Sequence, residues 1–400
     1  MLNRFSIVVL LVVLSASFYG VSARSAADQD NKRLKERLQV KIDDWHKSAK
    51  FSGATLGVTL ANGDSFGLAT GYSDRVKKTP MKADDYMLAG SVGKTYVAAV
   101  ALQLVDEGKI DLDARIGKYL GGEEWFQKLP NANDIVIRQL MNHTSGLVRY
   151  EFNPNFLKDL LKDPYKVWKP EEQISYLFGS KPPFGPGKGW DYSDTNYIVL
   201  GMIIEKVTGQ KYYELAKARL LKPLKLERTK PQTGPKIDGL IQGYAGKGNP
   251  FGGEDEMIKN GKFVFNPQFE WTGGGIVTTS KDLSRWAKML YEGKAFSSEM
   301  LKEMLDGVES RQLGPNSKYG LGVIIRPTSK GLSYGHSGFF PGYLTEVMYF
   351  PEDKIAIAVQ VNSSVPKDVG RPLGRAITEA FDAIKNSDAS DSEKRDQGSR

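Results

Sequence analysis

MLAGSVGKTYVAAVALQLVDEGKI, residues 87–110, combines a Ser-x-x-Lys tetrad with the pattern of an amphipathic helix. Apolar residues recur after the tetrad at three- and four-residue spacing, which predicts one buried helix face (Val97, Val100, Ala101, Leu104, Val105). Residues three apart share a helix face, so we expect the Lys94 amine beside the Ser91 hydroxyl. A serine in the first helical turn also lies among backbone N–H groups without internal partners. A hydroxyl, a neighbouring amine and free donors are the parts of an activated nucleophile.

The tetrad also has a purely structural interpretation. Ser91 would then cap a helix, and Lys94 would be a solvated helix charge. A second Ser-x-x-Lys occurs at Ser364–Lys367, but Pro366 and its polar surroundings indicate a loop. The choice between the two interpretations therefore depends on the other motifs of the chain.

Residues 1–23 have the three-part pattern of a secretory signal peptide. Arg4 precedes an apolar run from Ile7 to Leu14, and small residues follow up to Ala23. The apolar run is too short for a typical transmembrane helix, although an uncleaved anchor is the alternative. We therefore expect an exported protein, periplasmic or secreted, with no integral membrane span once the signal peptide is removed.

Charge and cysteine content exclude several classes of protein. The formal net charge is +8, but the basic residues are interleaved with acids, as in NKRLKERLQVKIDD, residues 31–44. No basic block or RNA-binding aromatic motif is present, so nucleic acid is not expected as a partner. The chain has no cysteine, which excludes disulfides, and its three histidines have no metal-ligand spacing. We expect neither a metal nor another cofactor, and the sequence does not predict the oligomeric state.

The order of predicted elements indicates an α+β fold. A helix at about 28–50 leads into two apolar runs that are separated by Asn62-Gly63, the strongest short hairpin signal. Residues 112–317 show several helical patterns broken by glycine- and proline-rich turns, and strand patterns return from Leu332, followed by a closing helix that ends near Ile384. Strands from both ends of the chain can form one antiparallel sheet that is flanked by the terminal helices.

The predicted organisation is a single catalytic domain, residues 28–385. Its α/β lobe comprises about 28–111 and 318–385, its mostly helical lobe about 112–317, and the active site lies between them. Within the helical lobe, residues 232–255 read as a surface excursion or lid. The polar tail, residues 386–400, lacks apolar anchors and is expected to be disordered.

Two further short motifs follow the tetrad. Tyr192-Ser193-Asp194 lies on a turn before an apolar helix, where side chains are free to point into a cleft. His336-Ser337-Gly338 ends a strand-like run.

These motifs in this order resemble those of the penicillin-recognising serine hydrolases. Within them the chain is most similar to the group of class C β-lactamases, D,D-carboxypeptidases, D-aminopeptidases and related esterases. Three other stretches share the resemblance, which covers roughly residues 35–385: LMNHTSGL at 140–147, FGPGKGWDYSDTNY at 184–197 and GGGIVTTSKDLSRW at 273–286. The resemblance implies a β-lactamase/transpeptidase-like fold.

The resemblance also implies roles for individual residues. Ser91 is expected to be the acylated nucleophile, and Lys94 and Tyr192 are expected to move its proton. The backbone N–H groups of Ser91 and Phe339 are expected to form the oxyanion hole. His336, where many relatives have lysine, is expected to hydrogen-bond near Tyr192 and orient the substrate. Substrate contacts are expected from Asp194, His336, Ser337 and Gly338, the glycine leaving room for substrate along the strand.

Two residues need separate treatment. His143 in LMNHTSGL has the position of an architectural residue, with the role of a triad base as its alternative. Asp194 departs from the family pattern, which has asparagine there. A carboxylate cannot donate a hydrogen bond to a substrate carbonyl. Its charge favours a protonated Lys94, which leaves Tyr192 or the substrate itself as the base, and it raises the pKa of Tyr192. It also leaves room for a substrate with an N–H donor or a cation.

The resemblance implies an exported serine acyl hydrolase that works through a covalent acyl-enzyme on Ser91. D-amino-acid peptides, cleaved by a D,D-carboxypeptidase-like peptidase, are the first choice of substrate, with the cell wall as their expected source. Small acyl esters come next and β-lactams third. The alternative from another class is a catalytically inactive, penicillin-binding-like sensor or scaffold.

Overall fold

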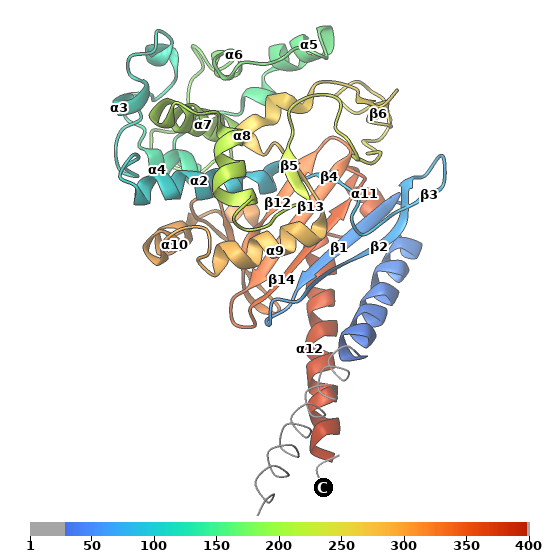
Figure 1. Cartoon of the computed structure of the whole chain (residues 1–400). Coiled ribbons are helices and arrows are strands. Elements are labelled where there is room, and N and C mark those ends of the chain that lie inside the picture. Colours follow the sequence, from blue (N-terminus) through green and yellow to red (C-terminus); the bar gives the residue numbers. More distant parts are fainter. Residues whose placement is uncertain (1–28, 398–400) are drawn as a thin grey trace, which may run out of the picture.

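The computed structural model describes residues 29–397, with side chains up to residue 386, so the expected signal peptide lies outside the described residues. In this part of the chain the main element is a nine-stranded antiparallel sheet with the order β3-β2-β1-β14-β13-β12-β11-β10-β9 (Figure 1). Its strands are β1 (Gly53–Thr59), β2 (Ser65–Asp74), β3 (Thr79–Pro80), β9 (Val308–Glu309), β10 (Lys318–Tyr319), β11 (Ile324–Thr328), β12 (Gly331–Phe340), β13 (Tyr343–Phe350) and β14 (Ile355–Val361).

The centre of the sheet joins the two ends of the chain. The predicted hairpin at Asn62-Gly63 is confirmed, because β1 and β2 pair from Thr59 opposite Ser65 to Gly53 opposite Gly71. On its other side β1 pairs with β14, with Ala54 opposite Val361. Every residue of β1 and β14 is buried, since helices cover both faces of the sheet.

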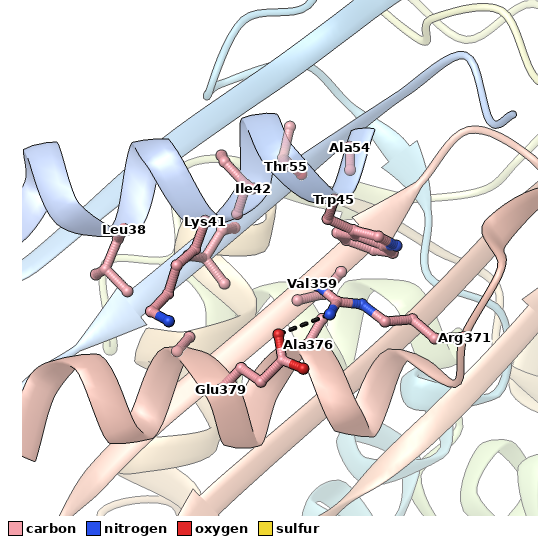
Figure 2. Close-up of a pocket in the computed structure, with 12 residues that line it drawn as sticks. Leu38, Lys41, Ile42, Trp45, Ala54, Thr55, Val359, Arg371, Ala376 and Glu379 are labelled. Atoms are coloured by element: carbon pink, nitrogen blue, oxygen red, sulfur yellow. Dashed lines mark hydrogen bonds and ion pairs between the residues drawn. The ribbon is translucent and has the colours of Figure 1, made fainter. Parts of the chain in front are cut away.

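One face is covered by the amino-terminal helix, residues 29–48, and by α12 (Leu373–Gln397). Figure 2 shows their contact, where the Trp45 ring lies over β14. The Trp45 indole N–H donates to the carbonyl oxygen of Val369 over 3.0 Å, and Arg371 pairs with Glu379 over 2.6 Å. The cavity beneath these side chains has a volume of only ≈ 10 Å³, room for about one water molecule. We therefore assign it no ligand.

The carboxyl-terminal segment differs from its expectation. α12 continues to Gln397, past the closing helix expected to end near Ile384 and into the segment expected to be disordered. No glycine or proline interrupts the sequence between Leu373 and Gln397 apart from Gly374, so nothing in its backbone chemistry stops the helix. Residues 398–400 lie outside the described part.

The second face of the sheet carries α9 (Ser280–Tyr291), which packs on β1, β13 and β14. Beyond it lie the remaining helices and two small sheets, β4-β8-β5 and β6-β7 (Figure 1). They are η1 (Gly90–Gly93), α2 (Lys94–Asp106), α3 (Gly117–Leu120), η2 (Phe126–Lys128), α4 (Ile137–Met141), η3 (Tyr150–Phe152), α5 (Pro154–Lys162), α6 (Pro170–Ser175), α7 (Asp194–Thr208), α8 (Tyr212–Ala216), η4 (Lys217–Leu221), η5 (Pro267–Gly273), α10 (Ser298–Leu305), η6 (Arg311–Leu313), β4 (Met87–Leu88), β5 (Thr229–Pro231), β6 (Ile258–Lys259), β7 (Lys262–Phe263) and β8 (Ile276–Thr278). The short helix α11 (Pro366–Val369) instead packs with the amino-terminal helix and α12.

α2 is more deeply buried than its sequence pattern predicts. The pattern indicates one apolar face, whereas all its residues from Lys94 to Leu102 are buried. The reason is its central place, because α2 contacts α7, α8 and the turns η1, η4 and η5. Small residues such as Ala98, Ala99 and Ala101 allow this close packing on all sides.

Candidate active site

Ser91 and Lys94 lie at the junction of η1 and α2. Ser91 was expected in the first turn of the α-helix, but it lies in the preceding 3₁₀ turn, and α2 begins at Lys94. The expected proximity is confirmed, because the Lys94 Nζ donates to the Ser91 Oγ over 3.2 Å. In a 3₁₀ turn residues three apart eclipse each other, so the tighter turn preserves the contact.

The turn that carries Ser91 packs closely against β12. A Cβ atom on Gly338 would lie 2.0 Å from the carbonyl oxygen of Ala89. The reason expected for this glycine is therefore wrong, because the space that it leaves is filled by the backbone before Ser91 and not by substrate. Gly338 allows the turn to approach the strand.

The free edge of β12 lies beside this turn. β11 pairs with β12 only from Gly331 to Gly335, which leaves residues 336–340 unpaired on that edge. The Phe339 side chain is 51% exposed, and a Cβ on Gly90 would lie 2.8 Å from the Phe339 nitrogen. Ser91 and Phe339 are thus neighbours, and their role as oxyanion donors remains a prediction.

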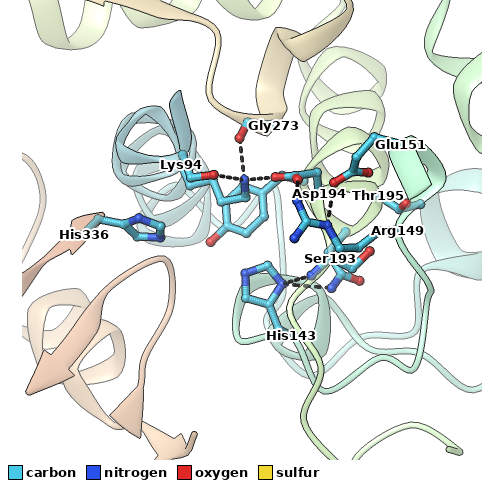
Figure 3. Close-up of polar contacts among 12 residues, drawn as sticks. Lys94, His143, Arg149, Glu151, Ser193, Asp194, Thr195, Gly273 and His336 are labelled. Atoms are coloured by element: carbon cyan, nitrogen blue, oxygen red, sulfur yellow. Dashed lines mark hydrogen bonds and ion pairs between the residues drawn. The ribbon is translucent and has the colours of Figure 1, made fainter. Parts of the chain in front are cut away.

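Lys94 makes three polar contacts at the centre of the site (Figure 3). Besides Ser91, its Nζ donates to the Asp194 carboxylate and to the carbonyl oxygen of Gly273. Burial lowers the pKa of Lys94, but the charges of Asp194, Tyr192 and Glu270 and the hydrogen bond to Asp194 together raise it above its usual value. The three hydrogens of an ammonium group match these three oxygen partners. These contacts agree with the expectation of a protonated Lys94.

Asp194, the first residue of α7, is paired on both oxygens. One oxygen accepts from Lys94, and the other accepts from Arg149 over 2.8 Å. Burial raises the pKa of Asp194, but Lys94 and Arg149 together hold it well below its usual range. Two protein cations therefore already offset the charge that was expected to leave room for a substrate cation, and a substrate contact of Asp194 remains a prediction.

Tyr192 lies two residues before α7, with the Lys94 Nζ 5.0 Å from its ring centre. Its hydroxyl is buried and has no hydrogen-bond partner among the described residues. Burial raises the pKa of Tyr192, the charge of Lys94 lowers it, and Asp194 raises it again, as expected; the net shift is upward. Lys94 and Ser91 also act on the pKa of this hydroxyl as hydrogen-bonding neighbours, which places it beside both groups.

His336 lies on β12, but its hydrogen bonds differ from the expectation. Its Nε2 accepts from the Tyr319 hydroxyl over 2.8 Å, and its Nδ1 donates to the Ser337 carbonyl oxygen over 2.6 Å. It makes no hydrogen bond to Tyr192, whose ring centre is 6.2 Å away. Burial lowers the pKa of His336 to about 3, with Lys94 adding to the effect. A neutral histidine with both nitrogens engaged supports the strand and cannot bind substrate through them.

His143 holds the segment that carries Tyr192. Its Nδ1 accepts from the Ser193 N–H over 3.3 Å and from the Asn196 amide over 3.0 Å. Its ring centre lies 4.2 Å from that of Tyr192. Burial, and then the charge of Lys94, lower the pKa of His143 well below its usual value. These contacts agree with the architectural interpretation.

Three charged residues near the site were not expected from the sequence. Arg149 pairs with Asp194 and also with Glu151, the latter over 2.6 Å. Glu270 lies on η5, close to Gly274. Arg149 and Glu151 come two and four residues after LMNHTSGL, and Glu270 comes three residues before GGGIVTTSKDLSRW. The one signal that could have indicated Arg149 was Asp194 itself, because a carboxylate buried in the site is expected to pair with nearby cations.

The described part of the chain offers few sites for other ligands. Within residues 29–397, no group of three or more His, Asp and Glu side chains is arranged to hold a metal ion. No helix in that range combines the length and apolar character needed to cross a membrane.

Comparisons with known proteins agree with this geometry. The family model described as Beta-lactamase matches residues 32–381. Penicillin-binding protein 4* of Bacillus subtilis is 26% identical over 80% of this chain and 70% of its own length. The teichoic acid D-alanine hydrolase of Staphylococcus aureus is 25% identical over 80% of this chain and 73% of its own length. A D-amino acid amidase structure from Ochrobactrum anthropi superposes with a TM-score of 0.74 at 26% identity, over 89% of this chain and 99% of its own. The chain belongs to the β-lactamase family, and it is a serine hydrolase.

Proposed function

We propose that this protein is an exported acyl hydrolase that forms an acyl-enzyme on Ser91 with D-amino-acid substrates. The observation that carries the proposal is the contact of Ser91 with a buried Lys94–Asp194 ion pair, beside the free edge of β12. An unpaired strand edge can hydrogen-bond an extended peptide or amide. This arrangement favours substrates with a peptide-like backbone.

The proposed reaction has two steps. In acylation the Ser91 Oγ attacks the substrate carbonyl carbon while its proton passes to the phenolate form of Tyr192, the minor form at neutral pH because the pKa of Tyr192 is raised. As the bond between the carbonyl carbon and the leaving group breaks, Tyr192 returns that proton to the leaving amine or alcohol. In deacylation water attacks the ester carbon, and the proton of the water passes by way of Tyr192 to Ser91. Lys94 remains an ammonium that stabilises the phenolate of Tyr192, because Asp194 holds its proton. The substrate itself is the alternative base.

The relatives support a D-configured substrate. They include a D-amino acid amidase and a teichoic acid D-alanine hydrolase, and their names share a D-amino acid as the acyl group. Our first choice remains a D-peptide, as for a D,D-carboxypeptidase. An ester of a D-amino acid is the second candidate, because Asp194 replaces the amide donor that would bind a peptide carbonyl.

Kinetics with matched enantiomers test the proposal. We would measure kcat/KM for D-alanine and L-alanine p-nitroanilide, for a peptide ending in D-Ala-D-Ala, and for p-nitrophenyl acetate. The expected result is a preference for the D-configured anilide of about tenfold or more, corresponding to about 1.4 kcal/mol, and loss of all turnover in Ser91→Ala. Equal rates for the two enantiomers would contradict the D-amino-acid proposal. A folded protein that turns over none of these compounds would indicate a sensor or scaffold.

A further inference from the structure

Glu270 carries a carboxyl group at the entrance to the Ser91 turn. A Cβ on Gly274 would lie 2.8 Å from the Glu270 Oε1 and 2.4 Å from the carbonyl oxygen of Gly90. The Glu270 carboxyl therefore fills the space that a side chain at Gly274 would need, next to the peptide unit before Ser91. The chain kinks at Trp271, whose φ of 35° is unusual for a residue other than glycine. Such strain is often found at functional sites.

Glu270 is the acid of this cluster that lacks a partner. Among the described residues the cluster holds two cations, Lys94 and Arg149, and three acids. Asp194 pairs with both cations and Glu151 pairs with Arg149. Glu270 is half-buried and makes no hydrogen bond or ion pair with a described residue. Burial, followed by the charge of Asp194, raises the pKa of Glu270 to about 8. A bound cation would relieve both effects.

The position suits one particular cation. In an α-amino acid the ammonium nitrogen is separated from the carbonyl carbon by a single Cα, a distance of roughly 2.5 Å. When the Ser91 Oγ attacks that carbonyl, the ammonium must lie within a few ångströms of the Ser91 turn. Asp194 is the poorer partner for it, because its charge is already offset by Lys94 and Arg149. Glu270 meets both requirements, since it is adjacent to Gly90 and unpaired.

We propose that Glu270 binds the free α-ammonium group of the acyl donor, so that the enzyme prefers aminoacyl amides and esters to N-acylated peptides. The inference rests on the proposed D-amino-acid hydrolase. Within it, the inference favours aminoacyl amides and esters over the N-acylated peptide donors of a D,D-carboxypeptidase, which were the first choice above. A peptide donor with an acylated nitrogen carries no charge there and leaves Glu270 unpaired. A D-aminoacyl donor supplies the missing cation and forms a charge-assisted hydrogen bond.

The test compares two substrates that differ only at that nitrogen. We would measure kcat/KM for D-alanine p-nitroanilide and N-acetyl-D-alanine p-nitroanilide in the wild type, in Glu270→Gln and in Glu254→Gln. Glu254 is an exposed acid that pairs with Lys259, so its variant controls for the loss of one negative charge. We expect Glu270→Gln to lower kcat/KM for the free amine by about 10- to 100-fold, the range for a hydrogen bond to a charged group. The N-acetyl substrate should change less than about threefold.

Several outcomes separate this inference from the proposed function. Hydrolysis of p-nitrophenyl acetate by Glu270→Gln reports an intact site, because that substrate has no amine. Glu270→Asp keeps the negative charge but moves it back by one methylene group. We expect it to give an intermediate loss of kcat/KM for the free-amine substrate. Parallel losses on both anilides, or no loss on either, would overturn the role of Glu270 while leaving the D-amino-acid hydrolase standing. If the wild type hydrolyses neither anilide, both proposals fail together.

Discussion

At the scale of single residues, the Asp194 carboxylate decides which group can accept the proton of Ser91. An amide in its place would leave Lys94 with a neutral neighbour and a lower pKa. The carboxylate instead pairs with Lys94 in a buried site, where charge interactions are stronger than in water. In the proposed mechanism Lys94 is therefore a fixed positive charge, and Tyr192 is the protein group that we propose accepts the proton.

The pH dependence of Asp194→Asn follows from this arrangement. Removing the negative charge lowers the pKa of Lys94 and also that of Tyr192, because Asp194 raises both. Whichever group is the base, it becomes available at lower pH. The acidic limb of kcat/KM should move down by about one pH unit or more, since one unit corresponds to about 1.4 kcal/mol of charge interaction. A limb that stays in place would contradict the coupling.

The same variant should lose stability, and a second change should restore part of it. Asp194→Asn removes the counter-charge that the buried Lys94 shares with the half-buried Arg149, at a cost of about 3–5 kcal/mol for the uncompensated Lys94. Arg149→Gln in the same chain removes one of the two cations, so the double variant should unfold at a higher urea concentration than Asp194→Asn alone. Equal or lower stability of the double variant would show that the three charges do not act as a unit.

The sequence revealed the local part of this site and missed the rest. Ser91 and Lys94 are three residues apart, so helical geometry alone brings them together. Arg149 reaches Asp194 across 45 residues of chain, a contact that no local pattern encodes. Glu270 was missed for the same reason, because its neighbours Gly90 and Gly274 come from distant segments.

At the scale of elements, the packing of η1 against β12 sets the position of the nucleophile. A Cβ on Gly338 would meet the backbone of Ala89, so Gly338→Ala must displace the turn that carries Ser91. A displacement of about 1 Å can cost about 100-fold in rate, and we expect acylation to fall by about 10- to 100-fold. Gly122→Ala is the matched control, because its Cβ would meet nothing within 4 Å. Similar acylation rates in the two variants would contradict this role of Gly338.

β12 should also make the folded protein sensitive to acid. The pKa of His336 is about 3 in the folded protein and about 6.5 in an unfolded chain. As the pH falls below about 6.5, His336 binds a proton in the unfolded state but stays neutral in the folded state. The free energy of unfolding therefore decreases. The contribution is about 2 kcal/mol between pH 7 and pH 5.

His336→Gln keeps an oxygen acceptor for the Tyr319 hydroxyl but cannot titrate. Urea unfolding at pH 7 and pH 5 should show a smaller loss of stability for this variant than for the wild type. His143 also makes the folded state less stable at lower pH, because burial lowers its pKa. This contribution is the same in the wild type and in His336→Gln. An equal loss in the two proteins would show that His336 does not titrate as its burial implies.

Elements with a strong local signal were predicted, and those without one were not. Asn62-Gly63 encodes the turn between β1 and β2, and the runs that become β12, β13 and β14 alternate or are wholly apolar. β9 and β10 are two residues long, too short to show any periodicity. The 3₁₀ turn at Ser91 was also missed, because its residues fit an α-helical start equally well.

At the scale of the whole molecule, the fold brings together residues from most of the chain. Ser91, Tyr192 and His336 come from a turn, a loop and a strand that are separated by helices and small sheets (Figure 1). The α+β class could be predicted because terminal strands and a helical middle imply it. The position of α9 on the sheet could not be predicted. An amphipathic sequence shows that a helix has a buried face, but it does not show which element covers that face.

The most direct measurement of the central claim is the mass of the intact protein after a brief incubation with a fluorescent penicillin and, separately, with p-nitrophenyl acetate. The account predicts that at least one reagent adds a single acyl group, that peptide mapping locates this group on Ser91, and that Ser91→Ala remains unmodified. It would be contradicted by a folded wild-type protein that neither reagent modifies, or by an adduct of equal yield in Ser91→Ala.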